Sequence, residues 1–381
     1  MRIVIAPDSF KECLSAVEVA EAIASGVRQV LAQADIVCVP MADGGEGSLD
    51  AVLAATQGQK KGLQVRNAND QPCEASWGWL GEGRAFIEMA AAAGLEQIAP
   101  SERKPLQASS YGVGQLIQEA VEAGARHIVL GLGGSATNDG GAGLLQALGA
   151  RLLDAQGKDL PRGGAALQQL DRISLDNIDP RLHEVQFEIA VDVDNPLCGL
   201  RGASAIFGPQ KGASPDDVAV LDAALSHFAD VCARQYGEDH RNIPGMGAAG
   251  GLGFAVKTCF KASFRPGVEL VAELSGLEAA LEGASLVFTG EGRMDAQTLL
   301  GKTPAGVARY ASRRDIPVIA LAGSLGDDYE ALYKVGISAA FSLAPGPVSL
   351  EQAYAQAAEY LRQRAGDCTR AWLAGANASL R

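Results

Sequence analysis

RIVIA, residues 2–6, is the apolar run that opens the chain and indicates its fold class. An unbroken apolar strand is typical of a parallel sheet whose two faces are both covered by helices. A helix is expected from Ala16, because Ser15 and Glu18 match a capping box. Residues 35–41 (DIVCVPM) predict a second strand. The chain therefore begins with alternating strands and helices.

The C-terminal hundred residues return to the same alternation. Apolar runs predict strands over 286–290 (LVFTG), 317–323 (PVIALAG) and 339–344 (AAFSLA). Two N-terminal and three C-terminal strands make five, the number in a flavodoxin-like, doubly wound parallel sheet of order 2-1-3-4-5. Helices are expected over 303–314, with Thr303 as N-cap before Pro304, over 327–334, and from a cap at Ser349 and Gln352.

The middle of the chain has a different pattern. Residues 62–90 carry short alternating runs broken by Asn, Asp and Gly, which predicts a β-meander. We therefore predict an α/β fold in which a flavodoxin-like domain, 1–61 plus 285–381, is interrupted by an inserted mixed α/β domain, 62–284. Further expected elements of the insertion are helices 113–123, 141–149, 215–235 and 250–258 and strands 127–132 and 187–193.

Composition excludes several classes of function. The 381 residues carry a net charge of −13, which disfavours general binding to nucleic acids or anionic membranes. The first apolar run is too short for a signal peptide, and no stretch approaches the ~18 apolar residues of a spanning helix. The seven cysteines form no CxxC pair, so disulfide and zinc frameworks are not expected. These features predict a cytoplasmic protein that acts on small molecules.

Acidic loops follow the first three expected strands of the flavodoxin-like domain. They are residues 8–11 (DSFK), 43–48 (DGGEGS) and 290–295 (GEGRMD). The carboxyl ends of parallel strands meet at one edge of a sheet, and ligands bind at that edge. Asp and Gly are also ordinary turn residues, which is the alternative explanation. Their common position favours a site.

A glycine-rich loop joins an expected strand to an expected helix within 128–149 (IVLGLGGSATNDGGAGLLQALG). Glycine lets the backbone approach a ligand, and successive N–H groups before a helix suit a phosphate. A glycine-rich turn that only packs closely is the alternative. GLGGSA also fits a loose G-x-G-x-x-A pattern with Asp154 further on, which leaves dinucleotide binding open. Lys302-Thr303 resembles the end of a P-loop, but Ala296 replaces its first glycine.

Two further segments of the insertion could carry chemistry. Alternation along the strand expected over 187–193 would place Asp192 and Asp194 on one face, as a ligand pair for a hard cation or as a base. Lys211 follows a Gly-Pro turn and could face an anion. An exposed aspartate pair and a solvated lysine are the alternatives. Residues 247–256 (GAAGGLGFAV) open a helix with glycines, which favours close packing over a second anion site.

Seven segments together resemble the bacterial glycerate kinases, in collinear order along nearly the whole chain. The resemblance implies a flavodoxin-like domain split by a restriction-endonuclease-like insertion. It also implies phosphorylation of D-glycerate by ATP with Mg²⁺, at the 2-hydroxyl in most relatives of this type. The segments are APDSFK (6–11), ADGGEGS (42–48), GLGGSATNDGGAG (131–143), DVDNPLCG (192–199), FGPQKGA (207–213), GAAGGLG (247–253) and TGEGRMDAQTLLGKTP (289–304).

Under this resemblance the glycine loop binds ATP, and glycerate lies in a cleft between the two domains. The nucleotide-binding residues are expected to be Gly133, Gly134, Ser135, Asn138, Asp139, Gly140 and Gly141. The substrate-binding residues are expected to be Asp8, Ser9, Lys11, Asp43, Gly44, Glu46 and Arg293. The metal ligands are expected to be Asp192, Asp194 and Glu291, and the catalytic residues Asp295, Asp192 and Lys211.

In this scheme Asp295 or Asp192 accepts the hydroxyl proton, and Asp295→Asn is expected to lower turnover far more than ATP binding. A monomer or homodimer is expected. Two alternatives remain open: an NAD-dependent dehydrogenase of a small hydroxy acid that uses GLGGSA, and a non-catalytic two-domain binding protein.

Overall fold

The computed structural model describes residues 1–299 and 301–378, so that Leu300, inside the 289–304 motif, lies outside the described residues. The chain divides into two compact units. The first comprises Met1–Asp43, Asp50–Gln57 and Pro266–Arg381, and the second comprises Gly44–Leu49 and Gly58–Arg265. Both units contain parallel strands, which confirms the expected α/β class.

The first unit is built on a five-stranded parallel sheet in the order β13-β12-β11-β1-β2. Four of its strands lie close to their expected positions. The fifth, β11, was expected to end at Gly290 but continues to Met294, because Glu291 and Arg293 pair with Ala322 and Ser324 of β12. The strands are β1 (Arg2–Ile5), β2 (Asp35–Cys38), β11 (Ala284–Met294), β12 (Val318–Leu325) and β13 (Ile337–Ser342).

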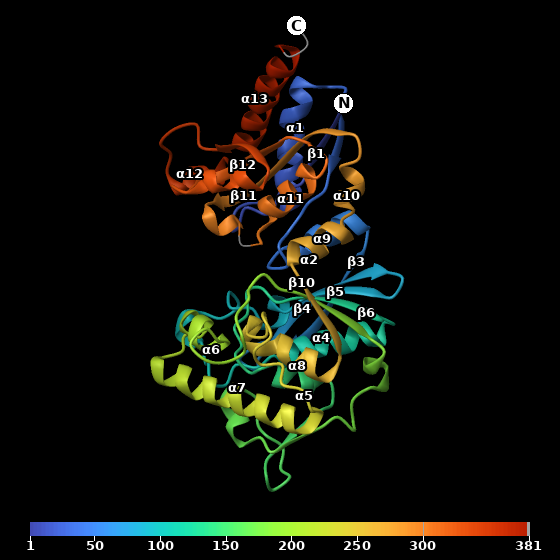
Figure 1. Ribbon diagram of the computed structural model, residues 1–381, viewed down its shortest axis with the longest axis vertical. Coiled ribbons are helices and arrows are strands. Elements are labelled where there is room, and N and C mark those ends of the chain that lie inside the picture. The colour runs from blue at the N-terminus through green and yellow to red at the C-terminus, as the bar shows by residue number, and fades with distance from the viewer. Residues whose placement is uncertain (300, 379–381) are drawn as a thin grey trace. The chain divides into compact units, whose positions relative to one another are not determined.

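Helices α1 (Ala16–Val30) and α13 (Ala357–Ala378) lie side by side against this sheet (Figure 1). Gly26 permits the approach, since a Cβ there would lie 2.0 Å from the Arg362 carbonyl oxygen. The capping boxes at Ser15 and Ser349 are confirmed. The single helix expected after Ser349 is divided at Gln356. The remaining helices of this part are α2 (Ser48–Thr56), α9 (Gly267–Leu274), α10 (Leu277–Ala280), α11 (Thr303–Ser312), α12 (Leu350–Ala355), and the 3₁₀ turns η6 (Ala296–Leu299) and η7 (Tyr329–Val335).

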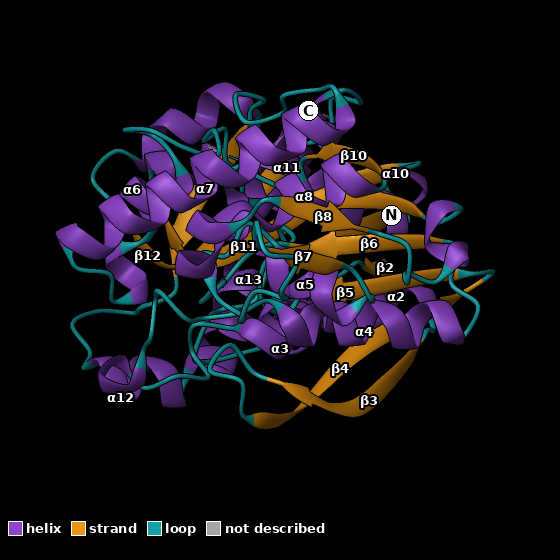
Figure 2. Cartoon of the chain, turned by 90° about the horizontal axis from the view of Figure 1, so that it is seen from below, coloured by secondary structure: helices purple, strands orange, loops and turns teal. Residues whose placement is uncertain are grey.

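The second unit contains a six-stranded mixed sheet in the order β10-β9-β6-β5-β4-β3. Four strands from β10 to β5 are parallel, whereas β4 pairs antiparallel with both β5 and β3, as the predicted meander requires. Figure 2 shows β3 and β4 as a long hairpin. The strands are β3 (Gln59–Arg66), β4 (Pro72–Gly81), β5 (Arg84–Glu88), β6 (His127–Gly131), β9 (Gln186–Ala190) and β10 (Lys261–Arg265), with β7 (Arg151–Leu153) and β8 (Arg172–Ser174) as a separate pair.

Helices cover this second sheet and share one apolar core with it. The cap at Ser214 with Pro215 at N1 is confirmed for the long helix α7. The strand expected over 187–193 ends earlier, at Ala190, so the segment that follows is a loop. The helices are α3 (Ala90–Ala93), α4 (Tyr111–Glu122), α5 (Ala142–Ala147), α6 (Ala203–Phe207), α7 (Pro215–Tyr236) and α8 (Leu252–Cys259).

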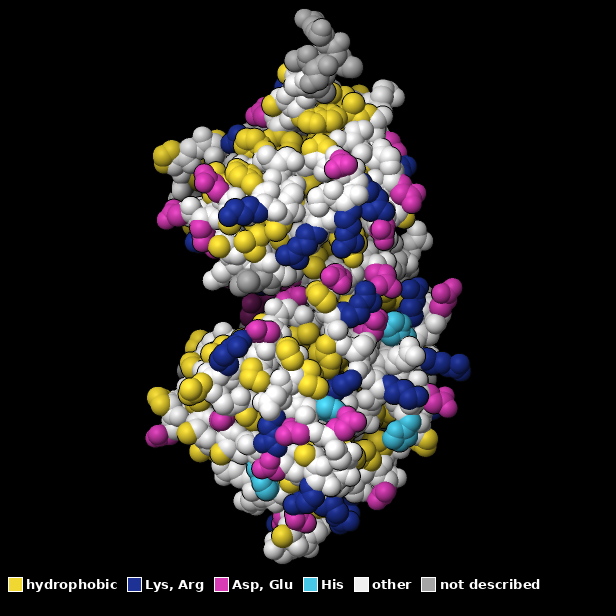
Figure 3. Space-filling model, viewed as in Figure 1, with side chains coloured by type: hydrophobic (Ala, Val, Ile, Leu, Met, Phe, Trp, Pro, Cys, Tyr) yellow, Lys and Arg dark blue, Asp and Glu magenta, His cyan; other side chains and the backbone are white. Residues whose placement is uncertain are grey.

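Acidic and basic side chains are interspersed over the face of the molecule shown in Figure 3. That face offers no continuous basic stripe of the kind that tracks a nucleic-acid backbone. Among the described helices, none combines the length and the apolar character needed to cross a bilayer.

Candidate active site

Asp8 follows β1 in the first unit and is held at the carboxyl end of the parallel sheet. Its backbone N–H donates to the Gly290 carbonyl at 2.8 Å. The Ser9 N–H donates to Oδ1 at 2.7 Å, and the Thr303 hydroxyl donates to Oδ2 at 2.6 Å. Burial, with the charges of Asp43 and Glu291 nearby, raises the pKa of Asp8 to about 7. A carboxyl group poised near neutral pH has the property that a general base requires.

Glu291 lies on the extended part of β11 and is buried. The Thr298 hydroxyl donates to its Oε1 at 2.6 Å, and Lys302 Nζ lies 3.3 Å from its Oε2. Burial raises the pKa of Glu291, while these two contacts act in the opposite direction. The Lys302 ammonium is thereby held in the same electrostatic cluster as Asp8. Lys302 is half-buried and can still meet an anion.

Asp295, one of the two bases expected from sequence (the other is Asp192), has a different environment. Arg293 Nε lies 3.1 Å from its Oδ2, and the Gln297 N–H donates to its Oδ1 at 3.0 Å. The bond from Arg293 is the largest of the influences that lower the pKa of Asp295. A carboxylate with a lowered pKa accepts a proton poorly at neutral pH. The hydrogen bonds of Asp295 stabilise the turn after β11, and its catalytic role stays a prediction.

The remaining substrate residues expected on this edge are divided between the units. Ser9, Asp43 and the exposed Lys11 belong to the first unit with Asp8, and Arg293 is also exposed there. Gly44 and Glu46 pack with the second unit instead, which differs from the single edge expected from sequence. The reason is steric: a Cβ on Gly131 would lie 2.5 Å from the Gly44 carbonyl oxygen, so the two glycine-rich loops are in backbone contact.

The interior half of the glycine loop is closed by its own side chains. Asp139 is fully buried and its carboxylate accepts from the N–H of Ser110 (2.8 Å), the Ser110 hydroxyl (2.9 Å), and the N–H groups of Gly141 and Gly143 (both 3.1 Å). The Gly140 N–H donates to the Gly250 carbonyl at 2.9 Å. Asn138 is buried and donates to the Ser204 hydroxyl at 2.7 Å. These amides are therefore already occupied.

The outer half of the loop, residues 133–135, has a different character. Gly134 is exposed, and Gly133 and Ser135 are half-buried. Within the described residues, the backbone N–H groups of these three positions make no hydrogen bond. The loop is held by its backbone carbonyls instead. The Gly131 carbonyl accepts from the Met89 N–H, and the Gly134 carbonyl accepts from the Leu95 N–H. This half retains the unused donors that a phosphate cradle needs.

Lys211, at the end of a 3₁₀ turn, is buried beneath the loop, with only 2% of its surface exposed. Its Nζ donates to the Ser135 hydroxyl at 2.8 Å and to the Thr137 carbonyl at 2.6 Å. Burial lowers the pKa of Lys211 to about 7, against the opposing influence of Asp139. The side chain therefore joins the outer and inner halves of the loop.

Lys211→Met is expected to change how stability depends on pH. The folded wild type binds fewer protons at Lys211 than the unfolded chain between about pH 7 and the ordinary lysine pKa of about 10.4, so wild-type stability should rise with pH over this range. The variant should lack that rise. Urea denaturation at pH 6.5 and 9 measures it, with the exposed Lys158→Met as control. Parallel stability profiles for wild type and Lys211→Met would contradict the assignment.

The expected metal ligands Asp192 and Asp194 do not pair on a strand face. The loop after Ala190 leaves Asp192 and Asp194 exposed instead of paired on a strand face, and Asp194 binds Arg201 at 3.0 Å. Both Glu291 oxygens are engaged, as described above. Across residues 1–299 and 301–378, no group of three or more His, Cys, Asp or Glu side chains is arranged to hold a metal ion. A magnesium site formed by Asp192, Asp194 and Glu291 stays a prediction.

Sequence reasoning missed Thr298, Lys302 and Thr303 as members of this cluster. Thr303 was expected to cap α11, but Lys302 occupies the N-cap position and the Thr303 hydroxyl binds Asp8 instead. The Gly-Lys-Thr ending of a P-loop was the available signal.

The geometry around Asp154 does not favour a dinucleotide. Its carboxylate accepts from the N–H groups of Gln156 and Lys158, both at 2.9 Å, in the turn after β7. Moreover, β7 pairs antiparallel with β8, whereas a ribose-binding acid follows a parallel strand.

The model of the glycerate kinase family matches residues 3–373, nearly the whole chain. The chain belongs to the glycerate kinase family. A glycerate kinase of Bacillus subtilis is 49% identical, with 96% of each chain covered, and a glycerate 2-kinase of Escherichia coli is 48% identical, with 93% of each covered. The crystal structure of a protein assigned as glycerate kinase 2 from Salmonella typhimurium is 47% identical, covers 99% of each chain and superposes with a TM-score of 0.90.

Glycerate kinase homology decides between the alternatives left open by the sequence. It identifies the chain as a kinase and gives no support to an NAD-dependent dehydrogenase. It also argues against a non-catalytic binding protein.

Proposed function

We propose that this chain transfers the γ-phosphoryl group of ATP to the 2-hydroxyl of D-glycerate. The single observation that carries the proposal is the match to the glycerate kinase family over nearly the full chain. The relative from Escherichia coli named glycerate 2-kinase supports the 2-hydroxyl as the acceptor.

The proposed base is Asp8. The glycerate hydroxyl oxygen forms a bond to the γ-phosphorus, the bond from that phosphorus to ADP breaks, and the hydroxyl proton passes to the Asp8 carboxylate. The hydrogen bonds from Ser9 and Thr303 hold Asp8 in a fixed orientation. Phosphoryl transfer depends on positioning and charge neutralisation, so a base with a pKa near 7 is sufficient.

Three cations are proposed to meet the anionic groups of the reactants. Lys302 is held by Glu291 within the Asp8 cluster, and Lys11 and Arg293 are exposed on the same unit. Positive charge near glycerate offsets repulsion between its carboxylate and the triphosphate. We propose these three as the contacts for the substrate carboxylate.

The glycine loop is proposed to bind the nucleotide through its outer half only. Unused N–H groups at Gly133, Gly134 and Ser135 support this assignment. Asn138, Asp139, Gly140 and Gly141 are proposed to shape the loop from inside. Lys211 is proposed as a positioning residue, because its ammonium binds the loop itself.

Magnesium is proposed only as a companion of the ATP phosphates. Mg²⁺ usually keeps several waters and takes one or two carboxylates together with substrate phosphate oxygens. Within the described residues, no group of three or more His, Cys, Asp or Glu side chains is arranged to hold a metal ion, and no step above uses the ion.

We also propose a flavodoxin-like domain with an inserted domain. The order β2-β1-β11-β12-β13 supports a flavodoxin-like domain, and the chain connectivity supports an insertion between β2 and β11. The limits 62–284 stay a prediction, beside a compact unit that covers Gly58–Arg265. Seven free cysteines support a reducing cytoplasm as the place of action. A restriction-endonuclease-like insertion and a monomeric or homodimeric state stay predictions.

An ADP-release assay with D-glycerate, glycolate and lactate tests the proposed function. ADP release should require ATP, and D-glycerate should give a kcat/KM at least 100-fold above that with either simpler acid. Equal rates with and without glycerate would contradict the proposal. Reduction of NAD by glycerate in the absence of ATP would do the same.

A further inference from the structure

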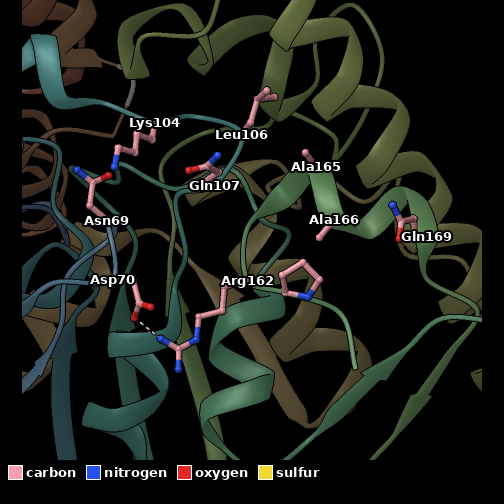
Figure 4. A pocket seen from close by; sticks show the side chains of 10 residues that line it. Asn69, Asp70, Lys104, Leu106, Gln107, Arg162, Ala165, Ala166 and Gln169 are labelled. Carbon is pink, nitrogen blue, oxygen red and sulfur yellow. Dashed lines mark hydrogen bonds and ion pairs between the residues drawn. The ribbon is translucent and has the colours of Figure 1, made fainter. Parts of the chain in front are cut away.

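A pocket apart from the candidate active site lies in the second unit, lined by residues of the segments 69–70, 104–107 and 161–169. Its volume is about 650 Å³. Figure 4 shows Lys104 and Asn69 on one side, the pair Asp70–Arg162 on another, and Ala165 and Ala166 opposite. None of these residues belongs to the glycine loop or to the Asp8 cluster.

The pocket concentrates positive charge in a strongly acidic protein. Lys104 and Arg162 line it, and Arg66 approaches Asp70 at 4.0 Å from outside the lining. Asp70, which forms an ion pair with Arg162, is the sole carboxylate in the wall. Within the described part of the chain, the Lys104 ammonium makes no hydrogen bond or ion pair and is exposed. The local excess of cations favours an anion.

Polar uncharged groups complete the wall. Gln107 and Gln169 both line the pocket with exposed amide side chains. An amide can donate and accept hydrogen bonds, so it can recognise a hydroxyl group. Cations alone would suit any anion, whereas cations with two amides suit an organic anion that carries hydroxyl groups.

The walls of the pocket are in backbone contact with the segments that hold the glycine loop. The Ala165 N–H donates to the Leu106 carbonyl at 3.1 Å. A Cβ on Gly164 would lie 2.2 Å from the Asn138 carbonyl oxygen, so the two backbones touch. Tightly packed segments of this kind transmit a displacement.

Tyr111 provides a second connection between the pocket and the glycine loop. The Arg162 guanidinium lies 3.4 Å from the centre of the Tyr111 ring. Tyr111 directly follows Ser110, which donates both its N–H and its hydroxyl to Asp139 inside the loop. An anion that draws Arg162 away from Asp70 would therefore also act on the start of α4 and on the closure of the loop.

We propose that this pocket is an effector site for a small hydroxylated organic anion, either a hydroxycarboxylate or its phosphate ester, and that its occupation changes the glycine loop. The proposed binding of the anion is argued from the pocket residues alone. The coupling to activity rests on the proposed kinase function.

Calorimetric titration of the full chain with D-glycerate, 2-phosphoglycerate and inorganic phosphate tests the binding. At least one organic anion should show two classes of site in the wild type. Lys104→Gln should weaken one class at least tenfold, while Lys158→Gln, a change of equal charge on the same unit, should weaken neither. Arg162→Gln provides a second lining variant. The ligand that shows two classes identifies which of the two chemistries the site prefers.

Kinetics test the coupling. Lys104→Gln should keep kcat and KM within about twofold of wild type at low anion concentration. In the wild type, the preferred anion should inhibit or activate without competing with either substrate, which for D-glycerate itself means a departure from hyperbolic kinetics at high concentration. Lys104→Gln should lose this effect.

A single class of sites in the wild type, or two classes that survive both lining variants, would overturn the proposal. Inorganic phosphate binding as tightly as the organic anions would overturn the assigned ligand class. Failure of the kinase function would appear separately, as absence of ADP release in wild type whether or not the pocket binds.

Discussion

Asp8→Asn is expected to lower kcat by about 10²–10⁴-fold, the usual contribution of a general base. The substituted amide keeps the size of the side chain but cannot accept the hydroxyl proton. In the wild type, kcat/KM should rise with pH through about 7, because Asp8 must be ionised to act. Steady-state kinetics from pH 5.5 to 9 measure both effects. ATP affinity should stay within about threefold of wild type.

Asp8→Asn should also be more stable than expected for a damaged site at pH values above about 7, the range in which the wild type is expected to be active. The folded wild type holds more protons at Asp8 than the unfolded chain between the ordinary aspartate pKa of about 3.9 and about 7, so the stability contributed by this group is lost as pH rises through that window. Asp8→Asn removes this loss. The variant should therefore be at least as stable as wild type at pH 8, with no such advantage at pH 4.5.

Asp295→Asn is the matched control. Asp295 is already paired with Arg293, so its replacement should lower kcat by less than tenfold and should leave the pH profile in place. A loss of about 10³-fold in Asp295→Asn with near-normal turnover in Asp8→Asn would favour Asp295, one of the two bases expected from sequence, and reject Asp8.

Asp139→Ala is expected to reduce the free energy of unfolding by about 3–5 kcal/mol, because it removes a buried, fully hydrogen-bonded carboxylate and leaves the nearby Lys211 charge uncompensated. The change leaves four hydrogen-bond donors without their acceptor, and each buried unsatisfied group costs about 1–3 kcal/mol before relaxation. It also removes the negative charge nearest the buried Lys211. Urea denaturation at pH 7.5 measures the loss.

Thr137→Val provides the control in the same loop. The Thr137 hydroxyl is buried and has no hydrogen-bond partner among the described residues. Replacement by valine keeps the shape and removes an unsatisfied polar atom, so stability should stay within about 0.5 kcal/mol or increase. Equal losses in the two variants would show that the loop responds to any change in packing, and the role given to the Asp139 hydrogen bonds would be wrong.

Hydrophobic patterning was sufficient for most elements of the first unit. The runs at 2–6, 317–323 and 339–344 each correspond to a strand of the parallel sheet. Patterning failed at β11, where the polar stretch 290–294 continues the strand because backbone pairing with β12 does not require apolar side chains. After Ala190 the alternating pattern predicted a strand that the structure lacks, because neither neighbouring strand, β6 or β10, pairs beyond that residue.

Sequence motifs indicated where candidate site residues lie better than they indicated what each residue does. The acidic edge at Asp8 and the glycine loop were located, but the tasks of individual residues depend on burial and on distant partners. Lys211 was expected to face an anion and is buried instead. Thr303 meets Asp8 across 295 positions of sequence, a contact that no local pattern contains. Asp8 and Asp295 look equivalent in the sequence. Burial raises the pKa of Asp8, whereas a hydrogen bond from Arg293 lowers the pKa of Asp295.

Phosphorus NMR of the product from ATP and D-glycerate identifies the phosphorylated hydroxyl and measures the contribution of Asp8. We expect a phosphate ester on the 2-hydroxyl, formed by the wild type in a 1:1 ratio with ADP. Its formation should be at least about 100-fold slower in Asp8→Asn. A product phosphorylated on the 3-hydroxyl would contradict the proposed acceptor. Inorganic phosphate with no ester, or undiminished ester formation by Asp8→Asn, would contradict the proposed chemistry.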